Sequence, residues 1–167
     1  PASFSFSGVT AGPIRAGAGF SATVTALIRG NVATPNFGRE TPAVTPTLGF
    51  TKRQPTGGGS QSGTFSGSLG SFSNGVAAAN ALSWTEVGNG DLTLNQLSYL
   101  GSGIDVSGAT GSGSVGNVGP FIPAHFTVTA TQACTTGGAF TYSGQPFNMT
   151  VTARNLAGDV TRNYDGS

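Results

Sequence analysis

The stretch Phe20-Ser21-Ala22-Thr23-Val24-Thr25-Ala26-Leu27-Ile28 alternates apolar and polar residues along most of its length. Successive side chains of a β-strand point to opposite faces, so this period of two predicts a strand with one buried face and one face in solvent. Thr and Val favour strands because their branched side chains pack well on a pleated surface. We therefore predict a half-buried strand at residues 20–28.

Shorter stretches of the same kind lie on both sides of this strand. Phe4 and Phe6 alternate with serines in residues 3–9, and further strands are predicted at residues 44–51, 64–72, 126–131, 139–142 and 147–155. Residues 76–82 contain three consecutive alanines, but good helix formers are scarce, and we favour an extended segment over a short helix. The sequence thus predicts an all-β chain, folded as an immunoglobulin-like antiparallel β-sandwich.

Two glycine-rich stretches are read as connections. Gly88-Asn89-Gly90 is a strong turn signal, so we predict a hairpin between residues 82–87 and 91–100, with a bulge near Asn95-Gln96 where the alternation changes phase. Residues 101–119 are rich in Gly and Ser and predict a linker or a long loop with one edge strand near residues 104–106.

The second half of the chain repeats parts of the first. Pro1-Ala2-Ser3-Phe4 resembles Pro123-Ala124-His125-Phe126, at an offset of 122 positions. Residues 20–26 resemble residues 147–153 at an offset of 127. Gly30-Asn31-Val32 matches Gly158-Asp159-Val160, and Asn36-Phe37 matches Asn163-Tyr164. Because this period equals one sandwich domain, we predict a complete domain at residues 1–117 and the first strands of an incomplete tandem repeat at residues 118–167.

An incomplete repeat has a physical consequence. Three strands of a sandwich expose an apolar face and open edges. We expect strand completion from other domains of the parent chain, from a neighbouring subunit, or by packing on the first domain. The chain starts at Pro1 without a signal peptide, and we interpret it as an internal or processed fragment.

Charge is scarce in this sequence. Charged residues make up 8% of the chain, the net charge is +1, and the seven basic residues are scattered, which argues against a nucleic-acid partner. No apolar run is long enough to span a bilayer. The single cysteine, Cys134, is interpreted either as a buried small residue or as one half of a disulfide to another part of the parent chain.

Candidate catalytic and metal-binding residues are few. The only histidine, His125, stands at a predicted strand start and is interpreted as a partly exposed domain-junction residue. Asp159 and Asp165 flank a loop where a calcium ion could bind between tandem domains, but turn residues explain them as well. We predict no catalytic, cofactor-binding or metal-binding residues and no enzymatic activity.

Trp84 and Glu86 are the one candidate site for ligand contact. The sole tryptophan is interpreted as a core anchor, with a sugar-stacking role as the alternative if its ring is exposed. Glu86 lies close to it in a predicted strand, either as a buried structural carboxylate with an arginine partner or as part of a ligand pocket.

Several strings also resemble a known bacterial family. They are Thr34-Pro35-Asn36-Phe37-Gly38, Ser83-Trp84-Thr85-Glu86-Val87-Gly88, Val118-Gly119-Pro120-Phe121-Ile122-Pro123-Ala124-His125-Phe126, and residues 140–147 and 151–155. In this order they resemble the C-terminal region of MshQ-like proteins of the mannose-sensitive haemagglutinin type IV pilus system. The resemblance implies a large exported protein connected with pilus biogenesis or adhesion, without established catalytic residues.

The leading hypothesis is a structural or adhesion module of a secreted or surface-exposed bacterial protein, pilus-associated and built of tandem units that could form a filament. The alternative is a carbohydrate-binding module with surface glycans as partners. An exposed aromatic platform would favour the second hypothesis over the first.

Overall fold

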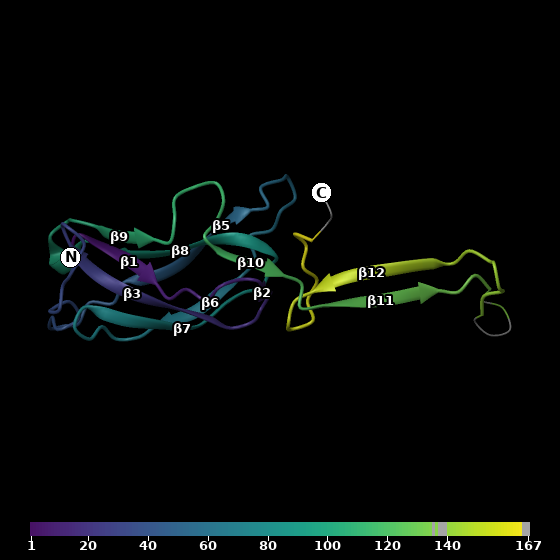
Figure 1. Cartoon of the computed structure of the whole chain (residues 1–167), viewed down its shortest axis with the longest axis horizontal. Helices are drawn as coiled ribbons and strands as arrows, with labels where there is room; N and C mark the ends of the chain where they lie inside the picture. The colour runs from purple at the N-terminus through teal and green to yellow at the C-terminus, as the bar shows by residue number, and fades with distance from the viewer. Residues whose placement is uncertain (135, 137–139, 165–167) are drawn as a thin grey trace.

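Two packed sheets and a separate hairpin are formed by residues 1–134, 136 and 140–164, the part of the chain that the computed structural model describes. The hairpin projects from the end of the sandwich opposite to the N-terminus, so the molecule is elongated (Figure 1). The chain passes from the sandwich to the hairpin directly after strand β10 (Val118–Ile122).

The first sheet contains the strand that was clearest in the sequence. Its order is β1 (Ser3–Ser7), β3 (Phe20–Ile28), β7 (Val76–Trp84) and β6 (Phe65–Leu69), with the short β4 (Val32–Ala33) paired to the end of β3. The strand predicted at residues 20–28 is confirmed with the same bounds, and Phe20, Ala22, Val24 and Ala26 are buried on one face. Residues 76–82 are extended, as predicted.

The second sheet faces the first. Its order is β2 (Ile14–Arg15), β10, β8 (Gly88–Gln96) and β5 (Thr47–Gln54), with β9 (Val106–Ala109) as a further neighbour of β8. The pairing of β2 with β10 is parallel and the other pairings are antiparallel. Together with the single-turn 3-10 helix η1 (Tyr99–Gly101), these elements confirm the predicted all-β sandwich.

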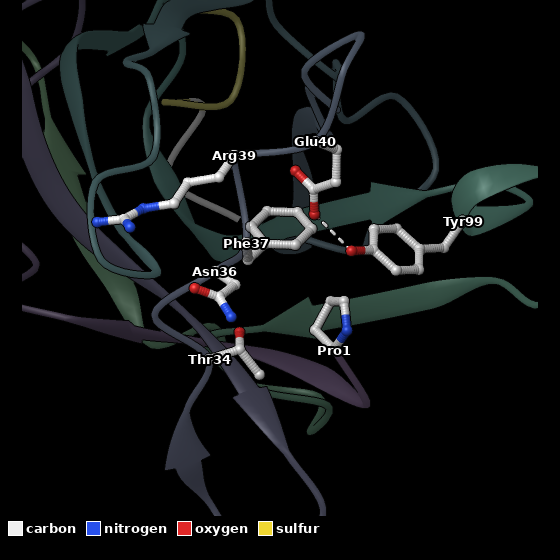
Figure 2. Close-up of a pocket in the computed structure, with 7 residues that line it drawn as sticks. All are labelled: Pro1, Thr34, Asn36, Phe37, Arg39, Glu40 and Tyr99. Carbon is white, nitrogen blue, oxygen red and sulfur yellow. Dashed lines mark hydrogen bonds between the residues drawn. The ribbon is translucent and has the colours of Figure 1, made fainter.

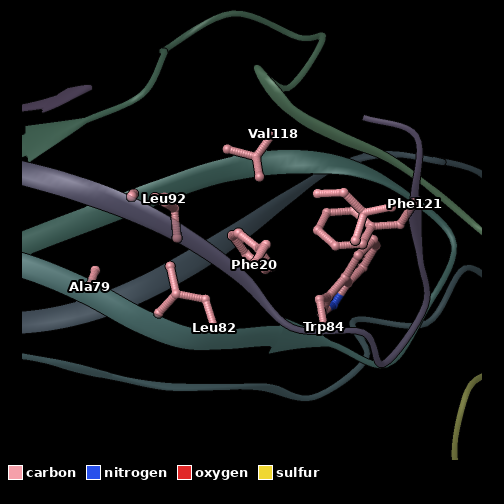
Figure 3. Close-up of a cluster of buried hydrophobic side chains, with 9 residues drawn as sticks. Phe20, Ala79, Leu82, Trp84, Leu92, Val118 and Phe121 are labelled. Carbon is pink, nitrogen blue, oxygen red and sulfur yellow. The ribbon is translucent and has the colours of Figure 1, made fainter. Parts of the chain in front are cut away.

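Aromatic and aliphatic side chains from both sheets fill the space between them. Figure 3 shows Trp84 beside Phe121 at one end of a cluster that continues through Phe20 to Leu82 and Leu92. The rings of Trp84 and Phe121 meet edge to face with centroids 5.2 Å apart, a favoured geometry for aromatic pairs. A second cluster, which includes Phe4, Val24 and Leu94, occupies the other end of the sandwich.

The predicted hairpin across Gly88-Asn89-Gly90 is wrong. β7 belongs to the first sheet and β8 to the second, so the chain crosses between sheets at residues 85–87, and all three turn candidates lie within β8. The glycines serve close packing instead: a Cβ on Gly88 would lie 2.0 Å from the Gln54 carbonyl oxygen, and one on Gly90 would lie 2.4 Å from the Phe50 ring. The pairing of β8 also runs regularly through Asn95 and Gln96, without the predicted bulge.

Two further strand predictions shift along the chain, and a third, at residues 139–142, does not form a strand in the residues that the structure describes. The strand expected at residues 44–51 spans residues 47–54, and the one near residues 104–106 becomes β9 at residues 106–109, on β8 as an outer strand. Of the strand expected at residues 139–142, residue 139 lies outside the described residues, and Phe140 forms an isolated bridge with Cys134.

The boundary expected between residues 117 and 118 falls one strand too early. β10 pairs with both β8 and β2, so residues 118–122 complete the second sheet of the sandwich. The separate part of the chain is the hairpin of β11 (His125–Thr131) and β12 (Asn148–Arg154), which forms a two-stranded sheet of its own.

The hairpin reproduces the pairing of the first two long strands. Phe126 pairs with Ala153 as Phe4 pairs with Ala26, and the offsets of 122 and 127 seen in the sequence link each residue to its counterpart. The correspondence continues after the strands: the Thr161 N–H donates to the Ala153 carbonyl at 3.0 Å, and the Thr34 N–H donates to the Ala26 carbonyl at 2.9 Å.

The loop after each of these strands also matches, but one residue away from the sequence alignment. Asn31 and Gly158 are 127 positions apart, have positive φ angles of 62° and 91°, and each closes a turn to the residue three positions earlier. Gly and Asn are the residues that tolerate this left-handed conformation best. Asn31 therefore corresponds to Gly158, whereas the sequence match had placed it opposite Asp159.

Candidate functional site

The base of the hairpin is bound to the end of the sandwich by a group of buried polar side chains, which we call the joint. The joint consists of the crossing segment 84–87 and the loops at residues 16–17 and 61–63 on the sandwich side, and of residues 155–163 after β12 on the hairpin side. In sequence these segments are far apart, and the fold brings them together at the point where β10 leads into β11 (Figure 1).

Glu86 is the central side chain of the joint. It is buried, its Oε1 accepts the backbone N–H of Arg162 at 3.1 Å, and its Oε2 accepts that of Asn163 at 3.1 Å. Hydrogen bonds to a carboxylate are stronger than those between neutral groups, and two of them offset part of the cost of burying the charge. Glu86 therefore holds the loop after β12 against the sandwich.

Asn163 forms a second polar contact in the joint. Its Oδ1 accepts the Gln61 N–H at 2.6 Å, while its Nδ2 donates to the Gln61 carbonyl at 2.9 Å and to the Val87 carbonyl at 3.3 Å. In these bonds the amide oxygen accepts once and the amide nitrogen donates twice, so both ends of the side chain are engaged. The side-chain amide of Asn163 thus bonds to both main-chain groups of Gln61, as a residue of a neighbouring β-strand would.

The opposite side of the joint is formed by the turn that follows β12. The Leu156 N–H donates to the Ala16 carbonyl at 2.9 Å, and the Asn155 Nδ2 donates to the Thr85 carbonyl at 3.3 Å. Asn155 is oriented by Asp159, whose N–H donates to the Asn155 Oδ1 at 2.9 Å. With contacts to three segments of the sandwich, the base of the hairpin has a defined orientation.

Trp84 is buried, so the condition for its alternative role in sugar stacking, an exposed ring, is not met. Its side chain is 0% exposed, and its Nε1 donates to the Ser62 carbonyl at 2.8 Å. Gly63, with φ +66°, covers the indole so closely that a Cβ there would lie 2.5 Å from Nε1. The ring is therefore a core anchor, without a free face on which a sugar could stack.

Glu86 was predicted as a structural carboxylate with an arginine partner or as part of a ligand pocket. The structure places it near Trp84 as expected, but its partners are the main-chain N–H groups of residues 162 and 163. Asn155 and Asn163 were not predicted as site residues. The sequence match of Asn163 to Asn36 marked it as part of the repeat, but nothing in the sequence indicated Gln61 or Glu86 as its neighbours.

An ion pair between the half-buried Arg53 and the buried Asp91 lies away from the joint and was also missed. The Arg53 Nε donates to Asp91 at 2.8 Å, and Asp91 also accepts the Thr110 hydroxyl and the Asn117 N–H. Burial by itself raises the pKa of Asp91, but the hydrogen bonds from Arg53, Asn117 and Thr110 outweigh it and leave the pKa below its ordinary value. This carboxylate ties β8 to β5 and to the segment around residues 110–117.

A pocket of about 480 Å³ lies at the far end of the sandwich (Figure 2). Its lining is mixed in chemistry: Pro1, Thr34, Asn36, Phe37, Arg39, Glu40 and Tyr99. The Tyr99 hydroxyl donates to Glu40, and burial together with this bond raises the pKa of Tyr99 to about 12. Burial also acts to raise the pKa of Glu40, but bonds from Tyr99 and from backbone N–H groups lower it overall.

A second hollow, of about 410 Å³, borders the joint. It is lined by residues 54–58, Ser60 and Asn163. These lining residues are uncharged, and the Lys52 Nζ donates to two of them, to the Pro55 carbonyl at 2.8 Å and to the Ser60 hydroxyl at 2.6 Å. The hollow therefore offers hydrogen-bonding groups next to one basic side chain.

The remaining candidate residues from the sequence analysis do not belong to the joint or to either pocket. His125 is exposed and opens β11 at the junction, as predicted. Asp165 lies outside the described residues, and among those that are described no group of three or more His, Cys, Asp or Glu side chains could hold a metal ion. Within the same part of the chain, no helix has the length and apolar character needed to cross a membrane.

The fold and the joint define a class of protein: a β-sandwich linked through a polar joint to a two-stranded hairpin that repeats the pairing of β1 with β3. Residues 86–167 match a family model described as DUF6701, third domain. The matched segment begins at Glu86 and includes β8, β9, β10 and the hairpin, so it contains both the central carboxylate of the joint and the loop that binds it. No curated protein and no solved structure matches the chain.

Proposed function

We propose that this chain is a structural module of a bacterial extracellular surface protein, in which sandwich units follow one another in series and hold an adhesive or otherwise functional part away from the cell. The observation that carries the proposal is the joint: the start of a second unit is bound to the end of the first by buried hydrogen bonds, centred on Glu86. A series of domains transmits position and force only if consecutive domains have a fixed relative orientation, and a buried polar joint provides one.

Three further features support this function. The surface is poor in charge, and the chain contains one cysteine and one histidine. The buried carboxylates that the structure describes have structural partners. The resemblance to MshQ-like proteins supports a secreted, pilus-associated location and assembly into a filament as the more specific form of the proposal.

The joint is tested by the substitution Glu86→Gln, which removes the charge and one acceptor oxygen while keeping the shape of the side chain. We expect hydrogen exchange at the Arg162 and Asn163 amides to accelerate at least tenfold, and small-angle scattering to show a broader distribution of molecular lengths. Glu40→Gln, at the far end of the sandwich, is the matched control and leaves both measurements unchanged. Equal exchange rates in the wild-type chain and the Glu86→Gln chain would contradict a stiffening role for the joint.

The location is tested on cells that produce the parent protein. Antibodies raised against the folded chain label intact cells if the module is exposed at the surface. Labelling only after the cells are opened would contradict this part of the proposal.

Carbohydrate binding is a second candidate, and the pocket at the far end of the sandwich favours it. Aromatic and hydrogen-bonding side chains occur together there, which is the chemistry that sugar sites use. A glycan array probed with the chain tests it, with Asn36→Ala and Arg39→Ala as variants that lose binding. Since Trp84 is buried, Trp84→Phe serves as the variant that keeps it.

A further inference from the structure

The hairpin carries on one face the side chains that form the core in the first unit. Phe4, Val24 and Phe37 are 4%, 0% and 2% exposed, whereas their counterparts Phe126, Val151 and Tyr164 are 49%, 52% and 54% exposed. The aromatic pair itself is preserved, because Phe126 and Tyr164 meet edge to face at 5.5 Å as Phe4 and Phe37 do at 5.4 Å. Further exposed apolar side chains of the hairpin correspond to core positions: Val128, Phe147 and Met149.

The first unit shows what covers this face. There β3 has β1 on one side and β7 on the other, with Val24 opposite Ala77 and Ala22 opposite Ala79. Leu94 of β8 and Val106 of β9, from the facing sheet, complete the cluster around Phe4 and Val24. In the first unit this apolar face is therefore covered by a neighbouring strand that has small side chains and by strands of the facing sheet that have larger ones.

The hairpin also has a free edge at the equivalent place. β12 pairs with β11 on one side, and in the part of the chain that the structure describes no strand pairs with its other side. A strand edge next to an exposed apolar face is the arrangement that binds an added strand, because main-chain bonds and side-chain burial form together.

We propose that this face and edge form the docking site for a β7–β8-like segment of the same parent chain. The first strand of that segment pairs antiparallel with β12 and places small apolar residues opposite Val151 and Met149. Its second strand crosses to the facing sheet and covers Phe126 and Val128. The inference rests on the proposed function in so far as both regard the hairpin as part of a serial array.

The register of the occupant follows from the duplication. In the first unit Thr23, Val24 and Thr25 lie opposite Ala78, Ala77 and Val76. We therefore expect the incoming strand to place residues of the same types opposite Thr150, Val151 and Thr152. A second copy of this chain, packed face to face, would cover the side chains but leave the free edge of β12 unpaired, so a strand satisfies more of the surface than a symmetric dimer does.

A single peptide can test the proposal, because residues 76–96 supply both β7 and β8 in one continuous stretch. The synthetic peptide of residues 76–96 is titrated into the chain of residues 1–167, and amide hydrogen exchange is followed by mass spectrometry. We expect saturable protection of β12 and no change in β3, and we expect the chain to bind the peptide as a monomer, without dimerising. A peptide with Leu92→Asp and Leu94→Asp binds at least tenfold more weakly.

The matched variants lie on opposite faces of β12. Val151→Asp places a charge on the apolar face and weakens peptide binding about tenfold or more, as expected for loss of one buried valine. Thr150→Asp, one position earlier on the other face, changes it less than twofold. Protection that is absent, or equal for both variants, overturns the proposal, and so does a concentration-dependent dimer that Val151→Asp abolishes, since a second copy would then be the occupant.

These outcomes are separate from those of the joint. If Glu86→Gln loosens residues 162 and 163 while the peptide fails to bind, the serial function stands and the docking proposal fails. If the peptide binds while the joint variant behaves as the wild type, the reverse holds.

Discussion

The two copies of one strand pair, β1 with β3 and β11 with β12, have the same register but different surroundings. The first is packed under a second sheet, and the second stands with its apolar face in solvent. The local features therefore do not depend on the core: strand pairing, the left-handed turn residue and the aromatic edge-to-face contact recur without it. What the facing sheet adds is burial, which is the largest stabilising contribution to a sandwich.

The largest difference between the two strand pairs is expected when the first phenylalanine of each aromatic pair is replaced. We expect Phe4→Ala to lower the free energy of unfolding by about 3–5 kcal/mol, because a buried phenylalanine is replaced by a cavity. Phe126→Ala, at the equivalent exposed position, changes it by less than about 0.5 kcal/mol. Urea denaturation followed by the fluorescence of Trp84 measures both, and equal losses would show that the hairpin face is already covered.

The next largest difference between the sandwich and the hairpin is expected in how their stability responds to acid. The pKa of Asp91 is lowered in the folded sandwich, so the unfolded chain takes up the proton more readily. Its stabilising contribution is therefore present above its ordinary value of 3.8 and is lost as the pH falls below it. We expect Asp91→Asn to cost about 2–3 kcal/mol at neutral pH, as for loss of hydrogen bonds to a charged group, and to flatten the pH dependence of the urea midpoint below pH 3.8.

Hydrogen exchange at the β11 and β12 amides is the control for this titration. Glu40, a second carboxylate with a lowered pKa among the residues that the structure describes, also belongs to the sandwich. The hairpin amides should therefore follow only the intrinsic pH dependence of exchange until the sandwich itself unfolds. A separate acid transition of the hairpin would contradict this difference between the two regions.

The third difference concerns two asparagines at equivalent positions in the loops, Asn163 and Asn36. Asn163 makes three side-chain hydrogen bonds in the joint, whereas Asn36 is exposed beside the pocket. Asn163→Ala should destabilise the joint by about 1–2 kcal/mol, observed as faster exchange of the Gln61 amide, and Asn36→Ala should leave that amide unchanged. An unchanged Gln61 amide in both variants would mean that the loop is held by Glu86 alone.

Local patterns in the sequence predicted much of the fold. The alternation in residues 20–28 determines a strand wherever its partners lie, and the similarity of residues 147–153 revealed the second copy. Gly88 and Gly90 misled because a glycine required for a close approach looks the same in sequence as a glycine required for a turn. The residues 118–122 were assigned to the wrong unit because their partners, β2 and β8, are distant in sequence.

The joint was beyond the reach of these patterns for a similar reason. Glu86 and Asn163 are 77 positions apart, and the contact joins a side chain to a main-chain N–H group, which leaves no pair of complementary side chains to recognise. Trp84 shows the converse: the sequence identified an important residue, and only its burial decided between a core anchor and a sugar platform.

The smallest expected effect concerns the turn that both copies share. Gly158 and Asn31 occupy the same left-handed position, so Gly158→Asn should be tolerated, while Gly158→Ala should cost about 1 kcal/mol because a Cβ without a polar group gains nothing in this conformation. The exchange rate of the Thr161 amide, which bonds to Ala153 directly after the turn, reports the difference. Asn31→Ala with the Thr34 amide is the same experiment inside the sandwich. There the surrounding core limits local opening, so we expect a smaller acceleration than at Thr161, and an equal one would mean that the facing sheet does not restrain this turn.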